Sequence, residues 1–361
     1  MLPSFLLTLG AGPAALGWIE GSADGLSAAA KLWGGVMADR VRRRKPLASI
    51  GYLVTATGTA AIGFCTSAGQ VLLCRVTAWI GRGSRGAARD VLMTEASRPE
   101  TRGRAFGLER AGDAFGAVLG PLLAMALMAR GTAPAHLVRA SVIPGFLAFL
   151  AIALLVVEGP HEPRLARFHL AGELSKVGRP FRTYLGGILL FGCGDFSRTL
   201  LILHATQTLT GTLFSLPGAS AAVALYVLHN AVSALAAFPI GVLADRIGHK
   251  RVVVLGYLFA AATTLGFALT PPTRVWLLIL FVCSGLYIAC EEVAEKSYAA
   301  TLLPAESRGT GMGLLAATNG LGDMISSALV GTLWALSPTH ALGFVVAASL
   351  QLVGAARIAQ R

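Results

Sequence analysis

Long stretches without a single charged residue dominate this chain. Two of them are VVVLGYLFAAATTLGFAL over 252–269 and WLLILFVCSGLYIAC over 276–290. A helix needs about 20 mostly apolar residues to cross a bilayer, and only helices or closed barrels satisfy their backbone hydrogen bonds there. Barrel strands alternate apolar and polar residues, whereas these stretches are continuously apolar. The sequence therefore predicts an all-α, polytopic membrane helical bundle.

We expect about 11 spans in the 361-residue chain. They cover residues 14–38, 47–66, 70–95, 105–129, 138–157, 182–208, 219–244, 251–270, 275–301, 309–336 and 340–358. The opening MLPSFLLTL is too short to cross a bilayer and lacks the basic start of a signal peptide. We interpret it as the last part of a first helix that is mostly missing.

Basic residues are distributed unevenly between alternate loops. The rich loops are 40–45, 98–104, 164–182, 246–251, 308 and 357–361, and the poor ones hold Arg130, Arg139 and Arg274. By the positive-inside rule the rich loops face the cytoplasm. We therefore expect a multi-pass protein of the bacterial inner membrane with a cytoplasmic C-terminus. The net charge of +12 then reflects topology and contact with the lipid bilayer rather than a nucleic-acid partner.

Two motifs recur at the same offset. GVMADRVRRRK over 35–45 is repeated as GVLADRIGHKR over 241–251, and PETRGRAFGL over 99–108 as PAESRGTGMGL over 304–314. The aspartate of the first pair and the arginine of the second both recur 206 positions later. This indicates a duplication. We predict an N-terminal half over 1–157, a cytoplasmic linker over 158–181 and a C-terminal half over 182–361.

The repeated Gly-x-x-x-Asp-Arg loop resembles the signature of the major facilitator superfamily, and the resemblance covers essentially the whole chain. It implies two six-helix halves and a monomeric secondary transporter that moves a small organic solute by alternating access. It implies no enzyme and no cofactor. The first copy departs from the pattern at Arg42, where glycine is usual.

The same resemblance implies a gating role for the loop signature. Its residues here are Gly35, Asp39, Arg40, Gly241, Asp245 and Arg246. The glycines permit close helix approach. The aspartates resemble a latch that meets basic loop residues and the positive N-terminus of a helix in the opposite half, here near Gly309 and Gly103. The alternative is that the loops serve membrane topology alone.

The predicted span 105–129 carries a second signature. Gly107, Gly116, Gly120 and Pro121 are similar to the glycine–proline motif of proton antiporters, although its final glycine pair is absent. Small residues at this spacing form a close-packing face, and proline permits a bend. The motif favours export by antiport. The alternative is an ordinary tight helix interface.

Charged residues inside spans are costly and usually functional. Asp24 lies one turn from Glu20, and two carboxylates that close favour sharing one proton. Asp113 lies near the middle of its span. Asp195 lies three residues from Arg198, and the alternative to a functional role is that these two neutralise each other. We assign Asp24, Asp113 and Asp195 to a substrate or proton pathway.

Two further charge sets correspond across the duplication. Arg82, Arg85 and Arg89 line one face of span 70–95. The offset of 206 positions makes Glu291 the equivalent of Arg85 and Glu295 the equivalent of Arg89. Glu292 lies next to Glu291. The resemblance implies that both spans line one cavity at matched depth. In one interpretation the two sets pair with each other or with neighbouring helices and form an inner gate. In the other, Arg85 binds an anionic group of the solute, or Glu291 or Glu292 carries a proton.

Our main hypothesis is proton-coupled efflux of a small organic solute. The alternatives are proton-coupled uptake of a charged nutrient or metal chelate, and a truncated transporter without function. Aromatic residues make up 7% of the chain, which is few for a drug cavity. The five cysteines all fall within spans and lack metal-site spacing, so we expect packing residues and no metal.

Overall fold

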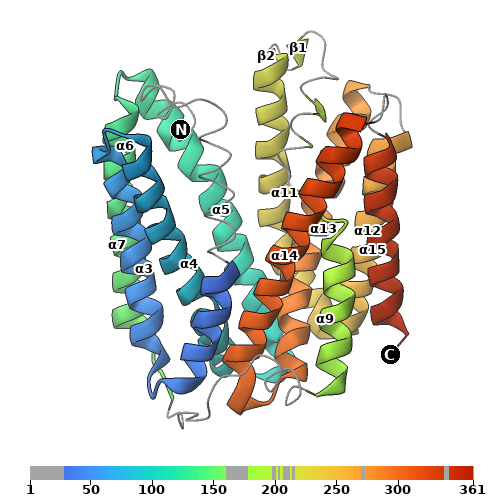
Figure 1. Ribbon diagram of the computed structural model, residues 1–361, viewed down its shortest axis with the longest axis horizontal. Helices are drawn as coiled ribbons and strands as arrows, with labels where there is room; N and C mark the ends of the chain where they lie inside the picture. Colours follow the sequence, from blue (N-terminus) through green and yellow to red (C-terminus); the bar gives the residue numbers. More distant parts are fainter. Residues whose placement is uncertain are drawn as a thin grey trace. The chain divides into compact units, whose positions relative to one another are not determined.

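The structure is a computed structural model. It describes residues 28–159, 178–196, 201, 204–205, 212–213, 216–269, 273–336 and 341–360. Most of these residues are helical, which confirms the predicted all-α class (Figure 1).

The first described helix covers residues 28–40. The other helices are α3 (Arg44–Ala61), α4 (Ala68–Ala96), α5 (Arg102–Ala129), α6 (Pro134–Ala140), α7 (Val142–Leu155), α9 (Arg179–Gly192), α11 (Gly218–Ile247), α12 (His249–Leu269), α13 (Arg274–Leu302), α14 (Arg308–Leu336) and α15 (Ala341–Ala359). Single 3₁₀ turns are η1 (Ile62–Phe64), η2 (Pro99–Thr101) and η3 (Ala305–Ser307). From α11 onward, each helix begins and ends within three residues of its predicted span.

Within the described residues, six helices are long and apolar enough to cross a membrane. They are Arg44–Phe64, Ala135–Leu155, Ala224–Ile247, His249–Leu269, Arg274–Leu302 and Ala341–Ala359. The helix α7 has no buried residue, and its Leu154 and Leu155 are 73% and 78% exposed. A face this apolar is suited to lipid. The total of eleven spans stays a prediction.

The chain forms two compact units. Unit 1 comprises Met1–Ala96, Gly120–Val177 and Leu303–Ala317, and unit 2 comprises Ser97–Leu119, Gly178–Leu302 and Thr318–Arg361. Each unit therefore includes one short segment of the other sequence half, taken from the N-terminal part of α5 or α14. The predicted boundaries at 157 and 182 stay a prediction.

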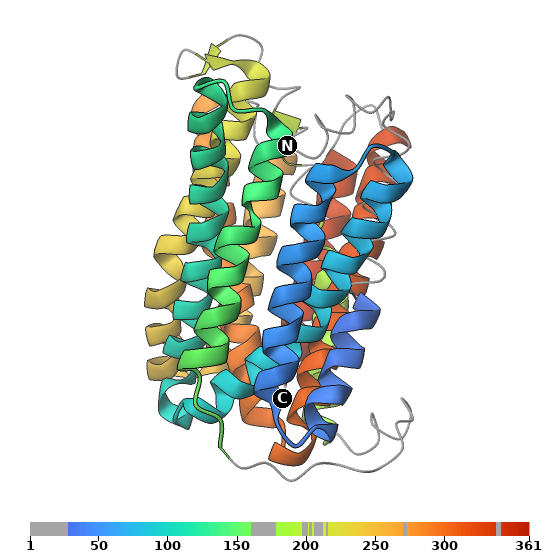
Figure 2. The same cartoon turned by 90° about the vertical axis from the view of Figure 1, so that its left-hand side faces the viewer.

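In unit 1, α3 lies between α4 and α7 (Figure 2). Its contacts use small side chains, because Gly58 lies against Ala78 of α4 and Gly145 of α7 lies against Ala56. Helices in a membrane associate through close packing rather than through a hydrophobic driving force. Small residues are therefore expected at these interfaces.

In unit 2, α12 packs on α13 and α15, and α15 packs on α9 (Figure 1). The core includes Phe267, Phe281 and Phe344, all nearly fully buried. Edge-to-face and tilted ring pairs join Phe267 to the other two. The helices α11 to α15 all contribute residues to this core.

The predicted span 182–208 is wrong as one continuous helix. The helix α9 ends at Gly192, residues 193–194 form a turn and residues 195–196 are not helical, whereas residues 201 and 204–205 are helical again. A two-residue antiparallel pair, β1 (Thr212–Leu213) and β2 (Leu216–Pro217), precedes α11 and was not expected. Neither Gly192 nor Gly194 has a positive φ, so this is not a left-handed glycine cap. A Cβ on Gly194 would collide with the Ala347 carbonyl oxygen of α15, so glycine here permits the close approach of α15.

Candidate functional site

In unit 1, the signature carboxylate of Asp39 lies at the N-terminus of α14. Its Oδ1 accepts a hydrogen bond from the Gly309 amide at 2.8 Å, and its Oδ2 accepts from the amide and the hydroxyl of Thr310, both at 2.7 Å. The first amides of a helix have no partner within the helix, and the macrodipole favours an anion there. Asp39 thus lies at the helix end that the sequence analysis named.

The Asp39 carboxylate is buried, with 1% of the residue exposed. It follows the predicted span 14–38. Burial raises the pKa of this carboxyl above its usual value, and the hydrogen bonds from Thr310 and Gly309 and the nearby Arg44 guanidinium oppose that rise. Hydrogen bonds to the ionised form favour that form, so the helix end compensates for the lost water.

Arg44 is a residue that sequence reasoning did not single out. It is fully buried, and its guanidinium contacts the Asp39 carboxylate at 4.0 Å and the Glu95 carboxylate of α4 at 2.5 Å. Its Nε donates to the Ala38 carbonyl at 2.8 Å. A buried arginine is stable only when its donors are satisfied. Within the basic run 40–45, nothing in the sequence distinguishes this arginine from its neighbours.

In unit 2, the second copy of the signature repeats the arrangement. The Asp245 carboxylate accepts hydrogen bonds from the amides of Gly103 at 2.7 Å and Arg104 at 3.0 Å, at the start of α5. The Arg104 Nε also donates to it at 3.0 Å. Both aspartates therefore join the end of one helix to the start of a helix from the other sequence half.

The signature glycines explain how these helices come so close. A Cβ on Gly35 would collide with the Gly309 carbonyl oxygen, and a Cβ on Gly241 would collide with that of Gly103. The reverse pairs are equally tight. Because any side chain would force the helices apart, glycine on both partners brings each carboxylate within reach of its amides.

The glycine–proline motif has a more limited counterpart. Gly107 lies against the Ala237 carbonyl of α11, where a Cβ would stand 2.6 Å from the oxygen. Among the described residues, nothing lies within 4 Å of a Cβ at Gly116 or Gly120. Of the three motif glycines, all of them among the described residues, Gly107 is thus the one that packs closely against another helix. Pro121 lies within α5, and the role of the motif stays a prediction.

The most deeply buried acidic groups of unit 2 lie on α13. Glu295 is 1% exposed and Glu291 is 8% exposed. The Glu295 carboxylate accepts hydrogen bonds from the Tyr257 hydroxyl of α12 and from the Asn319 amide of α14, the latter at 2.7 Å. The Tyr184 hydroxyl of α9 donates to the Glu295 carbonyl at 3.1 Å. Four helices therefore meet at this one residue.

Glu291 lies one helical turn from Glu295. Within the described part of unit 2, its Oε2 is buried and has no hydrogen-bond partner. A buried carboxylate without water must be paired, hydrogen-bonded or protonated. The pair thus combines one carboxylate fixed by two neighbours with one that keeps an acceptor position.

The other charges of α13 pair with α5. The Arg110 guanidinium lies 2.6 Å from the Glu292 carboxylate, and the Lys296 ammonium lies 3.4 Å from that of Glu109. The interpretation in which charges of this set pair with neighbouring helices therefore describes Glu292. Glu292 is thereby engaged in an ion pair within unit 2.

The remaining acidic candidates lie in different settings. Asp195 follows the end of α9, and its Oδ1 accepts from the Tyr287 hydroxyl of α13 at 3.3 Å. Asp113 is exposed on α5. Asp24 lies outside the described residues. Of these three, Asp195 is the one that the described contacts bring to α13.

The arginines of α4 contact aromatic rings of unit 1. The Arg85 guanidinium lies 3.7 Å from the Tyr52 ring centroid, and that of Arg82 lies 5.1 Å from Trp79. Arg89 lies 3.5 Å from the Asp90 carboxylate. Cations over ring faces are stabilised by the quadrupole of the ring. The predicted facing of Arg85 and Glu291 involves residues of the two separate units and stays a prediction.

The cysteines are half-buried free thiols, as expected for packing residues, and the Cys65 and Cys74 sulfur atoms lie 3.7 Å apart. In the portion of the chain that the structure covers, no group of three or more His, Cys, Asp or Glu side chains is placed to hold a metal ion.

Long apolar helices joined at their ends by a duplicated aspartate signature define a membrane transport protein. The chain belongs to the Major Facilitator Superfamily, whose family model matches residues 1–327. It is accordingly a membrane transporter of small solutes.

Relatives extend over most of the chain. An uncharacterised MFS-type transporter of Methanocaldococcus jannaschii is 28% identical over 350 residues, which are 96% of this chain and 87% of that protein. The multidrug resistance protein MdtH of Aeromonas salmonicida is 26% identical over 304 residues, which are 81% of this chain and 71% of that protein.

Solved structures share the fold at low identity. The human organic anion transporter MFSD10 matches with a TM-score of 0.76 and 14% identity over 99% of this chain and 88% of that chain. The fucose:proton symporter FucP of E. coli matches with a TM-score of 0.75 and 16% identity over 99% and 92%. At this identity the likeness shows the fold alone.

Proposed function

We propose that this chain is a proton-coupled secondary transporter that exports a small organic solute by alternating access. The observation that carries the proposal is the pair of buried carboxylates on α13. Glu295 is hydrogen-bonded by Tyr257 and Asn319, and Glu291 keeps an acceptor atom without a partner in the described residues. Ionisable groups buried in membrane helices commonly carry protons.

The coupling follows from the hydrogen bonds of Glu295. When a proton binds to the pair, Glu295 or Glu291 loses its charge. The hydrogen bonds from Tyr257 and Asn319 to Glu295 then become weaker. These donors belong to α12 and α14, so protonation changes the strength of the hydrogen bonds that join α12, α13 and α14. A bound proton can thereby favour one of two helix arrangements, which is the requirement for coupling.

The two aspartate signatures would serve as the cytoplasmic gate. Each joins helices of different sequence halves by hydrogen bonds to backbone amides. Opening toward the cytoplasm would require these bonds to break and water to replace them. Export is supported by the glycine–proline motif and by the similarity to MdtH.

Uptake of a charged nutrient or metal chelate is the second candidate. The acidic groups gathered on and near α13, with Asp195 hydrogen-bonded to Tyr287, suit a cationic solute better than an apolar one. In that case the direction of net movement would follow the proton into the cell.

The test uses purified protein in proteoliposomes with an imposed pH gradient. A pH-sensitive dye inside the vesicles reports proton movement while cationic drugs such as ethidium, and separately anionic metabolites, are added. A solute of the transported class should drive proton flux in the wild type. Glu295→Gln should reduce gradient-driven transport at least about tenfold, yet keep solute exchange without a gradient.

Glu306→Gln is the matched control, because this exposed carboxylate lies in η3 outside the proposed pathway. It should transport like the wild type. Gradient-driven transport that survives Glu295→Gln and Glu291→Gln, separately and together, would contradict proton coupling at this pair. Exchange with no pH dependence in the wild type would indicate a uniporter.

A further inference from the structure

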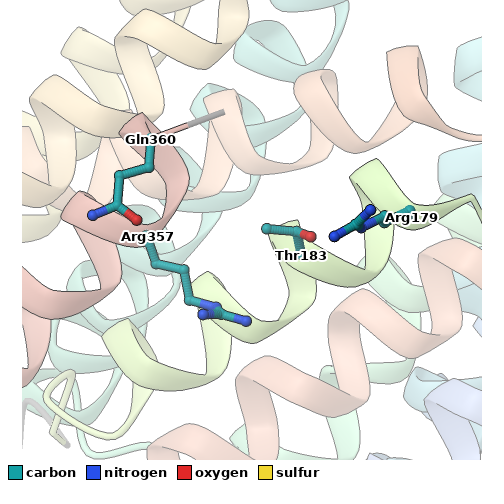
Figure 3. Close-up of a pocket in the computed structure, with 4 residues that line it drawn as sticks. All are labelled: Arg179, Thr183, Arg357 and Gln360. Carbon is teal, nitrogen blue, oxygen red and sulfur yellow. The ribbon is translucent and has the colours of Figure 1, made fainter.

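A small basic pocket lies where α9 begins and α15 ends. It has a volume of about 280 Å³ and is lined by Arg179, Thr183, Arg357 and Gln360. The Arg357 side chain extends from α15 toward α9, and the Arg179 side chain extends toward Thr183 (Figure 3). Two guanidinium groups from two helices therefore line one cavity within unit 2.

The glycines of α9 bring the two helices together here. A Cβ on Gly186 would stand 3.2 Å from the Arg357 Nε, and a Cβ on Gly187 would stand 3.1 Å from the Ile358 Cδ1. Arg357 therefore lies along a part of α9 that has no side chain. The arrangement orients its guanidinium toward the start of the helix, where the macrodipole adds positive potential.

The charges of the pocket are not neutralised by neighbours that the structure describes. Across those residues, neither Arg179 nor Arg357 forms an ion pair with a carboxylate. Arg44, Arg104 and Arg110, by contrast, each have a carboxylate within 4.0 Å. Two arginines that line one pocket and have no counter-ion among the described residues make a site that attracts an anion, and arginine matches the geometry of phosphate.

An apolar slot adjoins the basic pocket. It has a volume of about 160 Å³ and shares Arg179, Thr183 and Arg357 with the pocket, but its further lining is Pro180, Tyr184, Tyr298 and Ile358. A free inorganic anion gains nothing from such a slot. An amphiphile with a charged head and a hydrocarbon chain contacts both.

The position on the helices agrees with this chemistry. The helix α9 starts after the predicted cytoplasmic linker, and α15 ends at the predicted cytoplasmic C-terminus. Basic pockets between membrane helices on the cytoplasmic side are suited to anionic lipid head groups. The volume also lies just below the range of about 300–1,000 Å³ that is usual for sites of drug-sized ligands.

We propose that this pocket binds the phosphate of an anionic phospholipid in the cytoplasmic leaflet. Arg179 and Arg357 hold the phosphate, Thr183 and Gln360 provide neutral hydrogen-bonding groups, and the start of an acyl chain enters the slot between Tyr298 and Ile358. The carboxylates of α13 that would carry protons do not line the site, although Tyr184 of the slot donates to the Glu295 carbonyl.

The test is native mass spectrometry of the purified full chain with added lipid. Phosphatidylglycerol is compared with phosphatidylcholine of the same acyl chains. The wild type should retain phosphatidylglycerol with a preference of about tenfold or more, since each basic residue near a membrane surface adds attraction for anionic lipid. The R179Q/R357Q variant should lose this preference, and R179K/R357K should keep part of it.

The matched control is R43Q/R182Q, which removes two exposed basic side chains on the same predicted face, one of them on α9. It should keep the preference. If both double variants lose the preference for phosphatidylglycerol equally, the preference depends on net charge alone and the proposed site is overturned. A preference that survives R179Q/R357Q would also overturn it. Thermal unfolding with 1 mM inorganic phosphate distinguishes the sources, because stabilisation as large as that by phosphatidylglycerol would assign the pocket to free phosphate instead.

Discussion

At the residue scale, the two signature aspartates make the same contact in unequal surroundings. Asp39 is surrounded by buried partners, and the Arg44 side chain beside it is 0% exposed. The Asp245 side chain is also buried, but that of its partner Arg104 is 47% exposed. Loss of the carboxylate would thus remove one of the two anions beside a buried cation in unit 1 and leave Glu95 as its partner, whereas water can reach the cation in unit 2.

We expect Asp39→Ala to destabilise the protein more than Asp245→Ala. Each buried donor left without an acceptor costs about 1–3 kcal/mol. At Asp39 the Thr310 hydroxyl and the Arg44 guanidinium add to the two amides that both sites lose. The measurement is apparent thermal stability in detergent, with Glu100→Ala of the exposed η2 turn as control. Equal losses at the two aspartates would show that the surroundings do not matter.

At the element scale, the end of α9 is the feature that departs most from a simple membrane helix. The stop at Gly192 frees carbonyl groups inside the bundle, and the Gly194 carbonyl is met by the Gln351 amide of α15 at 3.0 Å. Gln351 is fully buried. Irregular backbone at membrane depth is tolerated where other helices satisfy it, and α15 does so here.

Gln351→Leu should therefore destabilise unit 2 although it makes α15 more apolar. The variant leaves the Gly194 carbonyl without its donor, at a cost of about 1–3 kcal/mol. Ser349→Ala is the control, since the Ser349 hydroxyl is exposed and bonds within its own helix. The loss should appear as a lower apparent unfolding temperature in detergent. If Gln351→Leu is as stable as the wild type, the end of α9 does not need a hydrogen-bond donor to the Gly194 carbonyl.

Much of the element order could be predicted from the sequence because its signals are local. Apolar runs bounded by charges gave the limits of α11 to α15, and the repeated motif pointed to Gly309 and Gly103 as helix starts. The end of α9 also had a local signal in GCGD, but the apolar residues on both sides concealed it. The sequence indicated three carboxylates of α13 as candidates without revealing their partners.

The partners could not be predicted because they depend on tertiary contacts. Arg44 pairs with Glu95, and the Glu158 carboxylate accepts from the amides of Arg44 and Lys45 at the start of α3. Glu158 lies more than 100 positions away in sequence. Many carboxylates in the chain could satisfy the same donors, so charge alone does not select one.

At the scale of the whole molecule, the duplication has preserved the contacts in which an aspartate bonds the first amides of a helix, here called the joints. It has not preserved the charged residues of α4 and α13. Both signature copies place an aspartate on the first amides of a helix. The equivalent positions of α4 and α13, in contrast, carry arginines in one copy and glutamates in the other. Conserved contacts and divergent charges are compatible, because the contacts maintain the fold while the charges of α4 and α13 are free to differ between the copies.

The positive-inside rule predicts that α14 and α5 start on the cytoplasmic side. We expect Ala305→Cys, in η3 before α14, to be shielded from a membrane-impermeant maleimide in whole cells and labelled after permeabilisation. Ala133→Cys, in the exposed turn before α6, should be labelled in both. Both variants are made in a chain whose five cysteines are replaced by alanine. The physical reason is the positive-inside rule, since the basic segments 98–104 and 246–251 are expected on one side. Labelling of Ala305→Cys in intact cells would reverse the orientation and place both aspartate joints on the outer face.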